Sequence, residues 1–158
     1  MNVIEVEVVK AVPAGVEPAF VRRILTRASK VPEMAARMPA GRSTVAVRIT
    51  SAEELRALNK AYAREDHTTD VLSFTGEGDH LGDIAVSWPA VVEQGRRQGH
   101  GENVELAILL VHGFLHLLGW DHRTRAETTE MWRLTDLPLS GRLAGYTRER
   151  GLRRSPRA

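Results

Sequence analysis

The 158-residue chain contains no cysteine. Without thiols the protein can form neither disulfides nor thiolate zinc sites, and it has no cysteine nucleophile. Long hydrophobic runs are also missing: the longest, Leu106 to Val111, is far too short to cross a bilayer. The first residues, MNVIEVEVVK, alternate polar and apolar side chains and do not form the apolar core of a signal peptide. We therefore expect a cytoplasmic protein that does not bind membranes.

The chain is long enough for one domain, and its 42% hydrophobic and 27% charged residues are typical of a soluble globular protein. Its net charge of +2 is unevenly placed. Residues 148–158, RERGLRRSPRA, hold five arginines and one glutamate, which leaves −2 for residues 1–147. We predict a single domain over residues 1–147 and a basic, flexible tail over residues 148–158. The tail suits a polyanion such as nucleic acid, and equally a solvated end that serves only solubility.

Alternation of apolar and polar residues predicts four strands: Ile4 to Val8, Thr44 to Thr50, Val71 to Phe74 and Asp83 to Ser87. Helical spacing and start signals predict helices over about Glu17 to Lys30, Ser51 to Ala63, Pro89 to Gln98 and Glu102 to Leu118, and another after His122. Residues 32–41 are rich in proline, glycine and arginine and predict a loop. We therefore expect an α+β fold with a mixed four-stranded sheet packed by helices.

The longest predicted helix carries the strongest functional signal. His112 and His116 are four residues apart, which places both imidazoles on one helix face, one turn apart. Gly119 follows at a position where glycine can end a helix in the left-handed conformation. The chain can then return His122 to the same point. We predict that the three histidines bind one transition-metal ion, most simply zinc, although nickel, copper and iron(II) accept the same ligands.

The order of His112, His116, Gly119 and His122 matches the metzincin protease spacing H-E-x-x-H-x-x-G-x-x-H. Gly113 stands where those proteases have the glutamate that acts as general base. The match therefore favours a zincin-like histidine helix at the centre of the fold and argues against peptidase chemistry. Three protein ligands leave a fourth position open, as in catalytic zinc sites, where bound water ionises near neutral pH.

Other polar residues near this segment have less specific signals. Asp121 can orient a ligand histidine or the water, or it can simply cap the turn after Leu118, and the sequence favours neither role. The remaining histidines, His67, His80 and His100, lie in polar or glycine-bearing stretches, and we expect them at the surface.

The segment HGFLHLLGWDH resembles the signature of the bacterial YbeY-type rRNA maturation factors, which are zinc-dependent endoribonucleases. Three other segments are similar to the same family: LNKAYAREDHTTDVLSF, LGDIAVS and ENVELAILLV. The resemblance covers roughly residues 50–131. It implies one domain, one zinc ion held by His112, His116 and His122, and single-strand-specific cleavage of RNA in rRNA processing and ribosome biogenesis. It also implies a cytoplasmic location, the small ribosomal subunit as a partner, and contacts with ribosomal or assembly proteins.

Two positions depart from the family pattern. The family has an arginine directly after the tyrosine of the second segment, where this chain has Ala63 and then Arg64. Because a guanidinium suits a phosphate, the protein either uses Arg64 from the shifted position or does without this arginine. The family's last helix continues after Met131, whereas TDLPLSG, from Thr135 to Gly141, interrupts it here.

The leading hypothesis is hydrolysis of RNA phosphodiesters by zinc-activated water. Arg64 and Asp121 are our candidate catalytic residues, and Asp66 and Asp70 are further candidates for the general acid. One alternative is a ribosome-assembly factor that binds RNA or protein and uses zinc only structurally. Another is a different metallohydrolase such as a peptidase. This is the weakest hypothesis, because Gly113 replaces the glutamate that a zinc peptidase needs.

Overall fold

The computed structural model describes residues 2–63 and 69–139. Several predictions from the sequence lie outside these residues. They concern Arg64, Asp66, His67, the basic tail and the domain boundary at residue 147.

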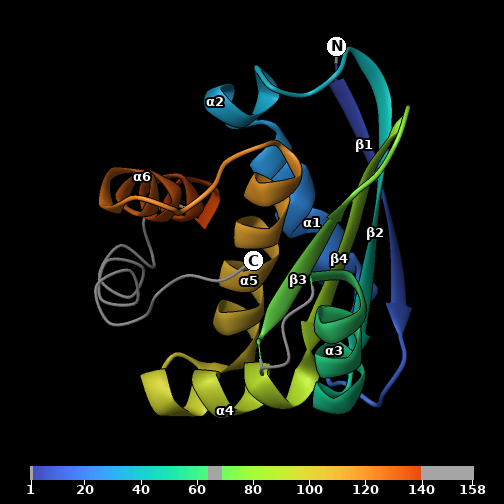
Figure 1. Cartoon of the computed structure of the whole chain (residues 1–158), viewed down its shortest axis with the longest axis vertical. Helices are drawn as coiled ribbons and strands as arrows, with labels where there is room; N and C mark the ends of the chain where they lie inside the picture. The colour runs from blue at the N-terminus through green and yellow to red at the C-terminus, as the bar shows by residue number, and fades with distance from the viewer. Residues whose placement is uncertain (1, 64–68, 140–158) are drawn as a thin grey trace.

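Four strands form one mixed sheet, as the sequence predicted (Figure 1). They are β1 (Asn2–Lys10), β2 (Gly41–Thr50), β3 (Val71–Thr75) and β4 (His80–Ser87), in the spatial order β1-β2-β4-β3. β1 and β4 each pair with β2 in parallel, and β3 pairs with β4 antiparallel through a tight hairpin. β1 and β3 are therefore the two edges of the sheet.

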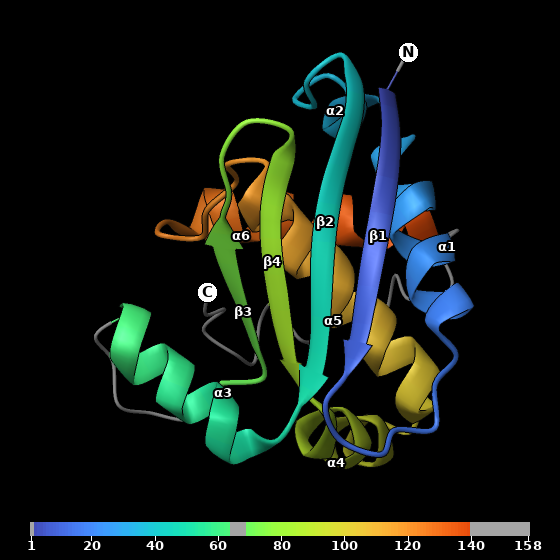
Figure 2. The ribbon, with the colours of Figure 1, turned by 90° about the vertical axis from the view of Figure 1, so that its right-hand side faces the viewer.

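Most helices cover one face of this sheet (Figure 2). α5 (Gly101–Leu117) crosses the middle of that face, with α1 (Pro18–Ser29), α4 (Trp88–Gln98) and α6 (Arg125–Asp136) packed around it. α3 (Ala52–Leu58) lies beside the other face, near β3 and β4 (Figure 2). The α+β fold with a central histidine-bearing helix is thus confirmed.

Three local predictions need correction. The segment predicted as a loop contains a short helix, α2 (Pro32–Ala35), which begins with proline at its first turn and buries Met34. α3 ends at Leu58 and continues as a π-helical turn over Asn59–Ala63, so the predicted α-helix to Ala63 is too long. α6 extends to Asp136 before a 3-10 turn at Leu137–Leu139, so the interruption starts two residues later than predicted.

Ser51 with Glu54 and Thr124 with Glu127 have the sequence pattern of a capping box at the start of a helix, and the two pairs have different outcomes. Thr124 Oγ1 accepts a hydrogen bond from the Glu127 backbone N–H, and the Glu127 carboxylate accepts one from the Thr124 N–H, which completes the box at the start of α6. Ser51 Oγ accepts from the Glu54 N–H, but the Glu54 carboxylate bonds Arg48 and Thr50 instead of returning to Ser51. Only half of that box forms, because Arg48, near the end of β2, competes for the carboxylate.

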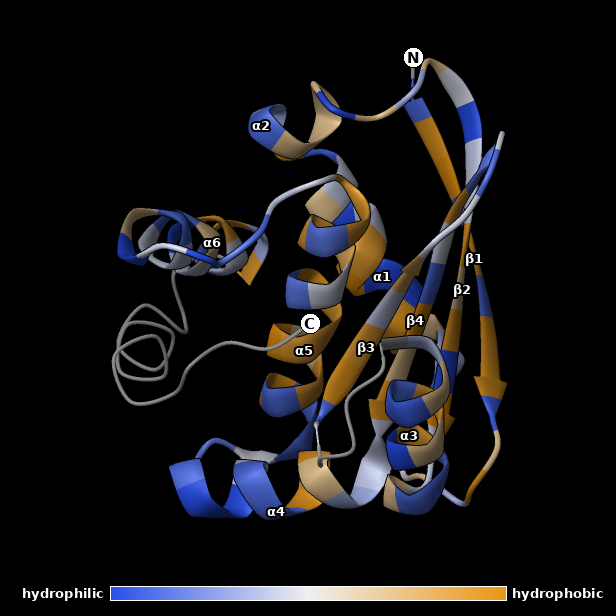
Figure 3. Cartoon of the chain, viewed as in Figure 1, coloured by the Kyte–Doolittle hydropathy of each residue, from blue (hydrophilic) through white to orange (hydrophobic). Residues whose placement is uncertain are grey.

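α5 is buried on nearly every side. All residues from Glu105 to Leu115 are buried, because the sheet covers one side of the helix and other helices cover the rest. A helix that is apolar all round is stable only in such a position. Figure 3 shows a different pattern on α4 and α6, along which hydrophilic and hydrophobic residues are mixed. Among the described residues, no helix has both the length and the apolar character needed to cross a membrane.

Gly113 sets how closely α5 approaches the sheet. A Cβ atom at this residue would lie 2.9 Å from Ile84 Cγ2 and 3.1 Å from Ser73 Oγ. The Ser73 hydroxyl donates a 2.9 Å hydrogen bond to the Gly113 carbonyl, which ties the helix to β3 at the same point. A glutamate side chain at residue 113 would therefore displace β3 or β4. Gly113, which stands where the metzincin proteases have their catalytic glutamate, is therefore also the residue that this packing requires.

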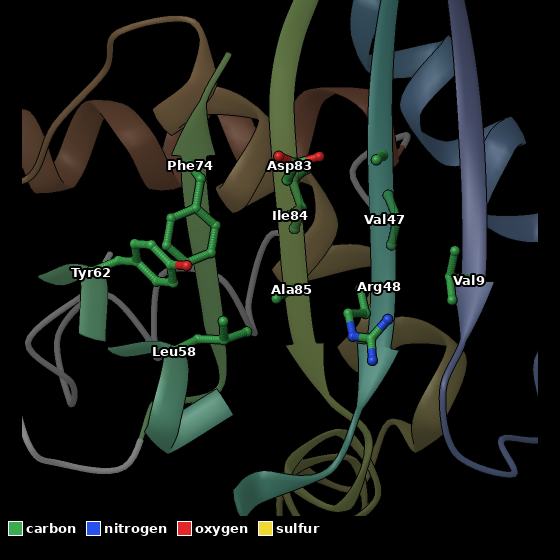
Figure 4. A pocket seen from close by; sticks show the side chains of 10 residues that line it. Val9, Val47, Arg48, Leu58, Tyr62, Phe74, Asp83, Ile84 and Ala85 are labelled. Atoms are coloured by element: carbon green, nitrogen blue, oxygen red, sulfur yellow. The ribbon is translucent and has the colours of Figure 1, made fainter. Parts of the chain in front are cut away.

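The face of the sheet away from α5 carries a hollow of about 450 Å³ (Figure 4). Leu58, Tyr62 and Phe74 line one side of it, and Ala85 and Arg48 lie on its floor. Tyr62 is 71% exposed and meets the Phe74 ring edge-on, with centroids 5.7 Å apart. Because the strands separate this hollow from α5, it is not part of the histidine site.

Replacing Gly113 with alanine should lower the free energy of unfolding. Overpacking a core position costs about 1–3 kcal/mol, while alanine gains about 1 kcal/mol in helix propensity over glycine. We expect a net loss of roughly 1 kcal/mol in urea denaturation, and a larger loss for Gly113→Val, which adds more volume beside Ile84. Gly15→Ala is the matched control, because nothing lies within 4 Å of a Cβ at that residue. A Gly113→Ala protein more stable than the wild type would contradict the close approach of α5 to the sheet.

Candidate metal centre

Three imidazoles meet where α5 ends. The ligand atoms of His112, His116 and His122 all lie within 4.8 Å of one another. The His116 ring is nearly perpendicular to the other two, with centroid distances of 4.8 Å to His112 and 4.7 Å to His122. This is the convergence that the sequence spacing predicted, and no other group of this kind occurs among residues 2–63 and 69–139.

The backbone explains how His122 reaches the two helical histidines. Gly119 has φ +99°, the left-handed conformation that favours glycine. The Gly119 N–H bonds the His116 carbonyl at 3.0 Å, and the Trp120 N–H bonds the Leu115 carbonyl at 3.0 Å. This pair of bonds is a Schellman motif, which ends α5 and reverses the chain. The predicted role of Gly119 is confirmed.

The donor set fits a metal ion. The Nε2 atoms of His116 and His122 are buried, and neither has a hydrogen-bond partner among the described residues. Buried polar atoms without partners are rare, and they call for an explanation such as a bound ion. Burial, followed by repulsion from His122, lowers the pKa of His116 from 6.5 to about 4. His116 is therefore a neutral imidazole at neutral pH, which is the form that binds a metal.

Neighbouring groups hold two of the three rings. The His116 ring N–H donates a hydrogen bond to the Trp120 backbone carbonyl. This bond favours the protonated ring, so it acts to raise the pKa of His116. Ligand histidines commonly use their second nitrogen in this way. On the other side of the site, the Trp132 ring of α6 stacks on His112 with centroids 5.5 Å apart and an interplanar angle of 28°.

Asp121 lies beside the site and caps the turn. Its Oδ1 accepts a 2.8 Å hydrogen bond from the His122 backbone N–H, and its Oδ2 is 2.9 Å from Arg123 Nε. The His122 N–H, and to a smaller extent the charge of Arg123, hold the pKa of this carboxyl below its usual range. The structure thus places Asp121 as a turn-capping carboxylate. A catalytic role for it stays a prediction, as does one for Asp70, which immediately precedes β3.

The three histidines differ in burial. His112 is buried at 4% exposure, while His116 and His122 are half-buried. Three imidazoles provide three of the four positions of a tetrahedral ion, and no fourth histidine or carboxylate joins the group among the described residues. A fourth position left to solvent is typical of catalytic rather than structural zinc sites.

The surface prediction for the other histidines is only partly correct. His80 is half-buried on the sheet, hydrogen-bonded to Thr44 and Asp83. The prediction for His100 is wrong. Its side chain is 3% exposed, and its Nε2 lies 2.9 Å from Oε1 of the fully buried Glu105 side chain. The turn between α4 and α5 is tight, because a Cβ on Gly95 would lie 2.5 Å from the Gly101 carbonyl oxygen. This turn brings the His100 side chain against α5.

Comparisons with known proteins agree with this arrangement. The sequence model of the family described as Endoribonuclease YbeY matches residues 14–140. A Roseiflexus castenholzii protein named Endoribonuclease YbeY is 38% identical over 130 residues, which cover 75% of this chain and 79% of the relative. One of the same name from Halalkalibacterium halodurans is 37% identical over 131 residues, covering 73% and 80%. The solution structure of TM1509 from Thermotoga maritima shares the fold, with a TM-score of 0.59, 22% identity and coverage of 98% and 99%.

The histidine cluster should bind one divalent transition-metal ion per chain. Because the unfolded chain lacks the assembled site, bound metal should raise the melting temperature. His116→Ala should abolish both the stoichiometric binding and the thermal shift, while His80→Ala, outside the cluster, should keep both. Metal analysis after dialysis and thermal unfolding with and without a chelator measure the two effects. Equal metal content in wild type and His116→Ala would contradict the assignment.

Proposed function

The chain belongs to the YbeY endoribonuclease family, and we propose that it cleaves single-stranded ribosomal RNA during ribosome maturation, using one zinc ion held by His112, His116 and His122. The observation that carries the proposal is the convergence of the three ligand nitrogens within 4.8 Å in a chain of this family. An endoribonuclease that cleaves by hydrolysis needs a group that activates water against a phosphodiester. The histidine cluster is the strongest candidate for that centre among the described residues.

Zinc is the ion that we propose for this site. Three uncharged imidazoles and a fourth position for solvent match catalytic zinc, although nickel, copper and iron(II) accept the same ligands. The ion, when bound, supplies Lewis acidity that polarises a phosphoryl oxygen and makes water nucleophilic at neutral pH.

The protein's own contribution is to hold and orient the ligands. The helix spacing fixes His112 and His116, and the Schellman turn delivers His122. The Trp120 carbonyl and the Trp132 ring restrain His116 and His112 against rotation. Ligands restrained in this way lose less freedom on metal binding, which strengthens the site.

Gly113 shifts the chemistry away from peptides. A zinc peptidase uses a glutamate beside the first histidine as its base, and the packing of α5 on Ile84 leaves no room for one. Hydrolysis of a phosphodiester depends less on such a base, because a cation and an arginine can stabilise the charge that develops on the phosphate. We propose Arg64 as the phosphate-binding arginine and Asp121 as the carboxylate that orients the His122 loop.

The setting we propose is the cytoplasm, with the small ribosomal subunit as the source of the RNA and ribosomal or assembly proteins as neighbours. The five arginines in residues 148–158 support this proposal, because a basic segment strengthens binding to RNA of any sequence.

The test compares zinc-loaded wild type with His116→Ala on a single-stranded RNA and on the same RNA in a duplex. We expect cleavage of the single strand by the wild type only, abolished by a chelator and restored by zinc. His80→Ala should cleave like the wild type. Equal residual cleavage by wild type and His116→Ala would identify a contaminating nuclease and remove the proposed activity.

The same preparation separates catalysis from a purely structural zinc. If the zinc is structural, pure wild-type protein should bind RNA or ribosomal subunits without cutting them. His116→Ala should then be less stable than the wild type. Circular dichroism and urea denaturation of His116→Ala therefore accompany the cleavage assay. A folded His116→Ala protein without activity supports the enzyme.

A further inference from the structure

The turn that delivers His122 is held from outside α5 by one arginine. Arg37 lies two residues after α2, and its Nη1 donates a hydrogen bond to the Leu118 carbonyl at 3.4 Å. Its guanidinium carbon lies 3.6 Å from the centroid of the Trp120 ring. Arg37 therefore touches the residues on both sides of Gly119, across 81 positions of sequence.

Trp120 connects this contact to the metal ligands. Its N–H closes the Schellman motif on Leu115, and its carbonyl accepts from the His116 ring. It also stands two residues before His122. A movement of Trp120 would thus rotate one ligand and displace another.

The segment that carries Arg37 is anchored in the fold. Met34 and Met38, on either side of it, are buried at 0% and 8% exposure. The Arg37 N–H bonds the Met34 carbonyl at 3.1 Å, and Asn2 Nδ2 bonds the Ala35 carbonyl at 3.0 Å, tying the segment to β1. Figure 1 shows α2 beside the C-terminal end of α5. The guanidinium is therefore presented from a fixed base.

The contact has two physical sources of strength. The last carbonyls of a helix lack intrahelical partners and carry partial negative charge, so a guanidinium at that end is favourable. A cation over the face of tryptophan is attracted by the ring as well. Together these interactions hold the turn from Leu118 to Trp120, in addition to the packing of Trp120 against the core.

We propose that Arg37 is a positioning residue of the metal site, which orders the turn from Leu118 to Trp120 so that His116 and His122 face one ion. The inference rests on the proposed metal site and assigns Arg37 no contact with RNA. It predicts that the arginine affects zinc affinity more than it affects the stability of the metal-free fold.

The experiment measures the zinc dissociation constant of the full chain by competition with a chromogenic chelator, without RNA. Arg37→Ala should bind zinc about tenfold more weakly or worse, as expected when an outer contact of a metal site is lost. Arg37→Lys keeps the charge but not the planar fork, so its zinc affinity should lie between those of the wild type and Arg37→Ala. Arg22→Ala is the matched control, because Arg22 is also exposed and its Nε donates to a distant backbone carbonyl, that of Val6 at 3.1 Å. It should bind zinc like the wild type.

A double-mutant cycle tests the route through Trp120. If Arg37 acts through this ring, Arg37→Ala should weaken zinc binding much less in a Trp120→Ala background than in the wild type. Urea denaturation of the metal-free proteins shows whether the Arg37 variants remain folded. Because the Arg37 side chain is exposed and is not part of the hydrophobic core, we expect similar unfolding midpoints for wild type and Arg37→Ala without metal.

The outcomes separate this inference from the proposed function. Wild type that binds zinc with the same affinity as Arg37→Ala would overturn the positioning role and leave the metal site intact. Unchanged zinc affinity with weaker RNA binding would also overturn it and make Arg37 a substrate contact. Wild type that binds no zinc would overturn the metal site itself.

Discussion

His112, His116 and His122 bring their ligand nitrogens within 4.8 Å of one another at the end of α5. The Nε2 atoms of His116 and His122 are buried without hydrogen-bond partners among the described residues, which is costly, and neighbouring rings repel when protonated. A shared cation turns this cost into binding energy. The end of α5, the left-handed Gly119 and the packing of Trp132 on His112 are all consistent with keeping these nitrogens together.

The position of α5 links the fold to the chemistry. The helix is apolar on almost every side, so it must lie between the sheet and the other helices, and it can approach β3 and β4 closely only with glycine at residue 113. This steric demand removes the base on which zinc peptidases with the same histidine spacing depend. A packing requirement in the core thus restricts the reactions that the metal can assist, and it agrees with the endoribonuclease family to which the chain belongs.

Short-range patterns in the sequence were enough to predict the strands, the histidine helix and the turn at Gly119, because these depend on periodicity, spacing and glycine conformation. Features that depend on which side chains meet in the folded chain were missed, even between residues five or six apart. Glu54 bonds Arg48 instead of completing its capping box, and His100 is buried against Glu105. The contact of Arg37 with Leu118 and Trp120 gives no local signal at all, since an exposed arginine after a short helix resembles any other surface charge.

X-ray absorption at the zinc edge of the purified, zinc-loaded protein tests the three-histidine site, because it counts the ligands of the bound ion. We expect three histidine nitrogens at about 2.0–2.1 Å and one further light-atom ligand from solvent. Substitution of His116 should reduce the number of histidine ligands in the spectrum. A site with two or fewer histidine nitrogens in the wild type, or with a fourth ligand supplied by the protein, would contradict the open three-histidine centre.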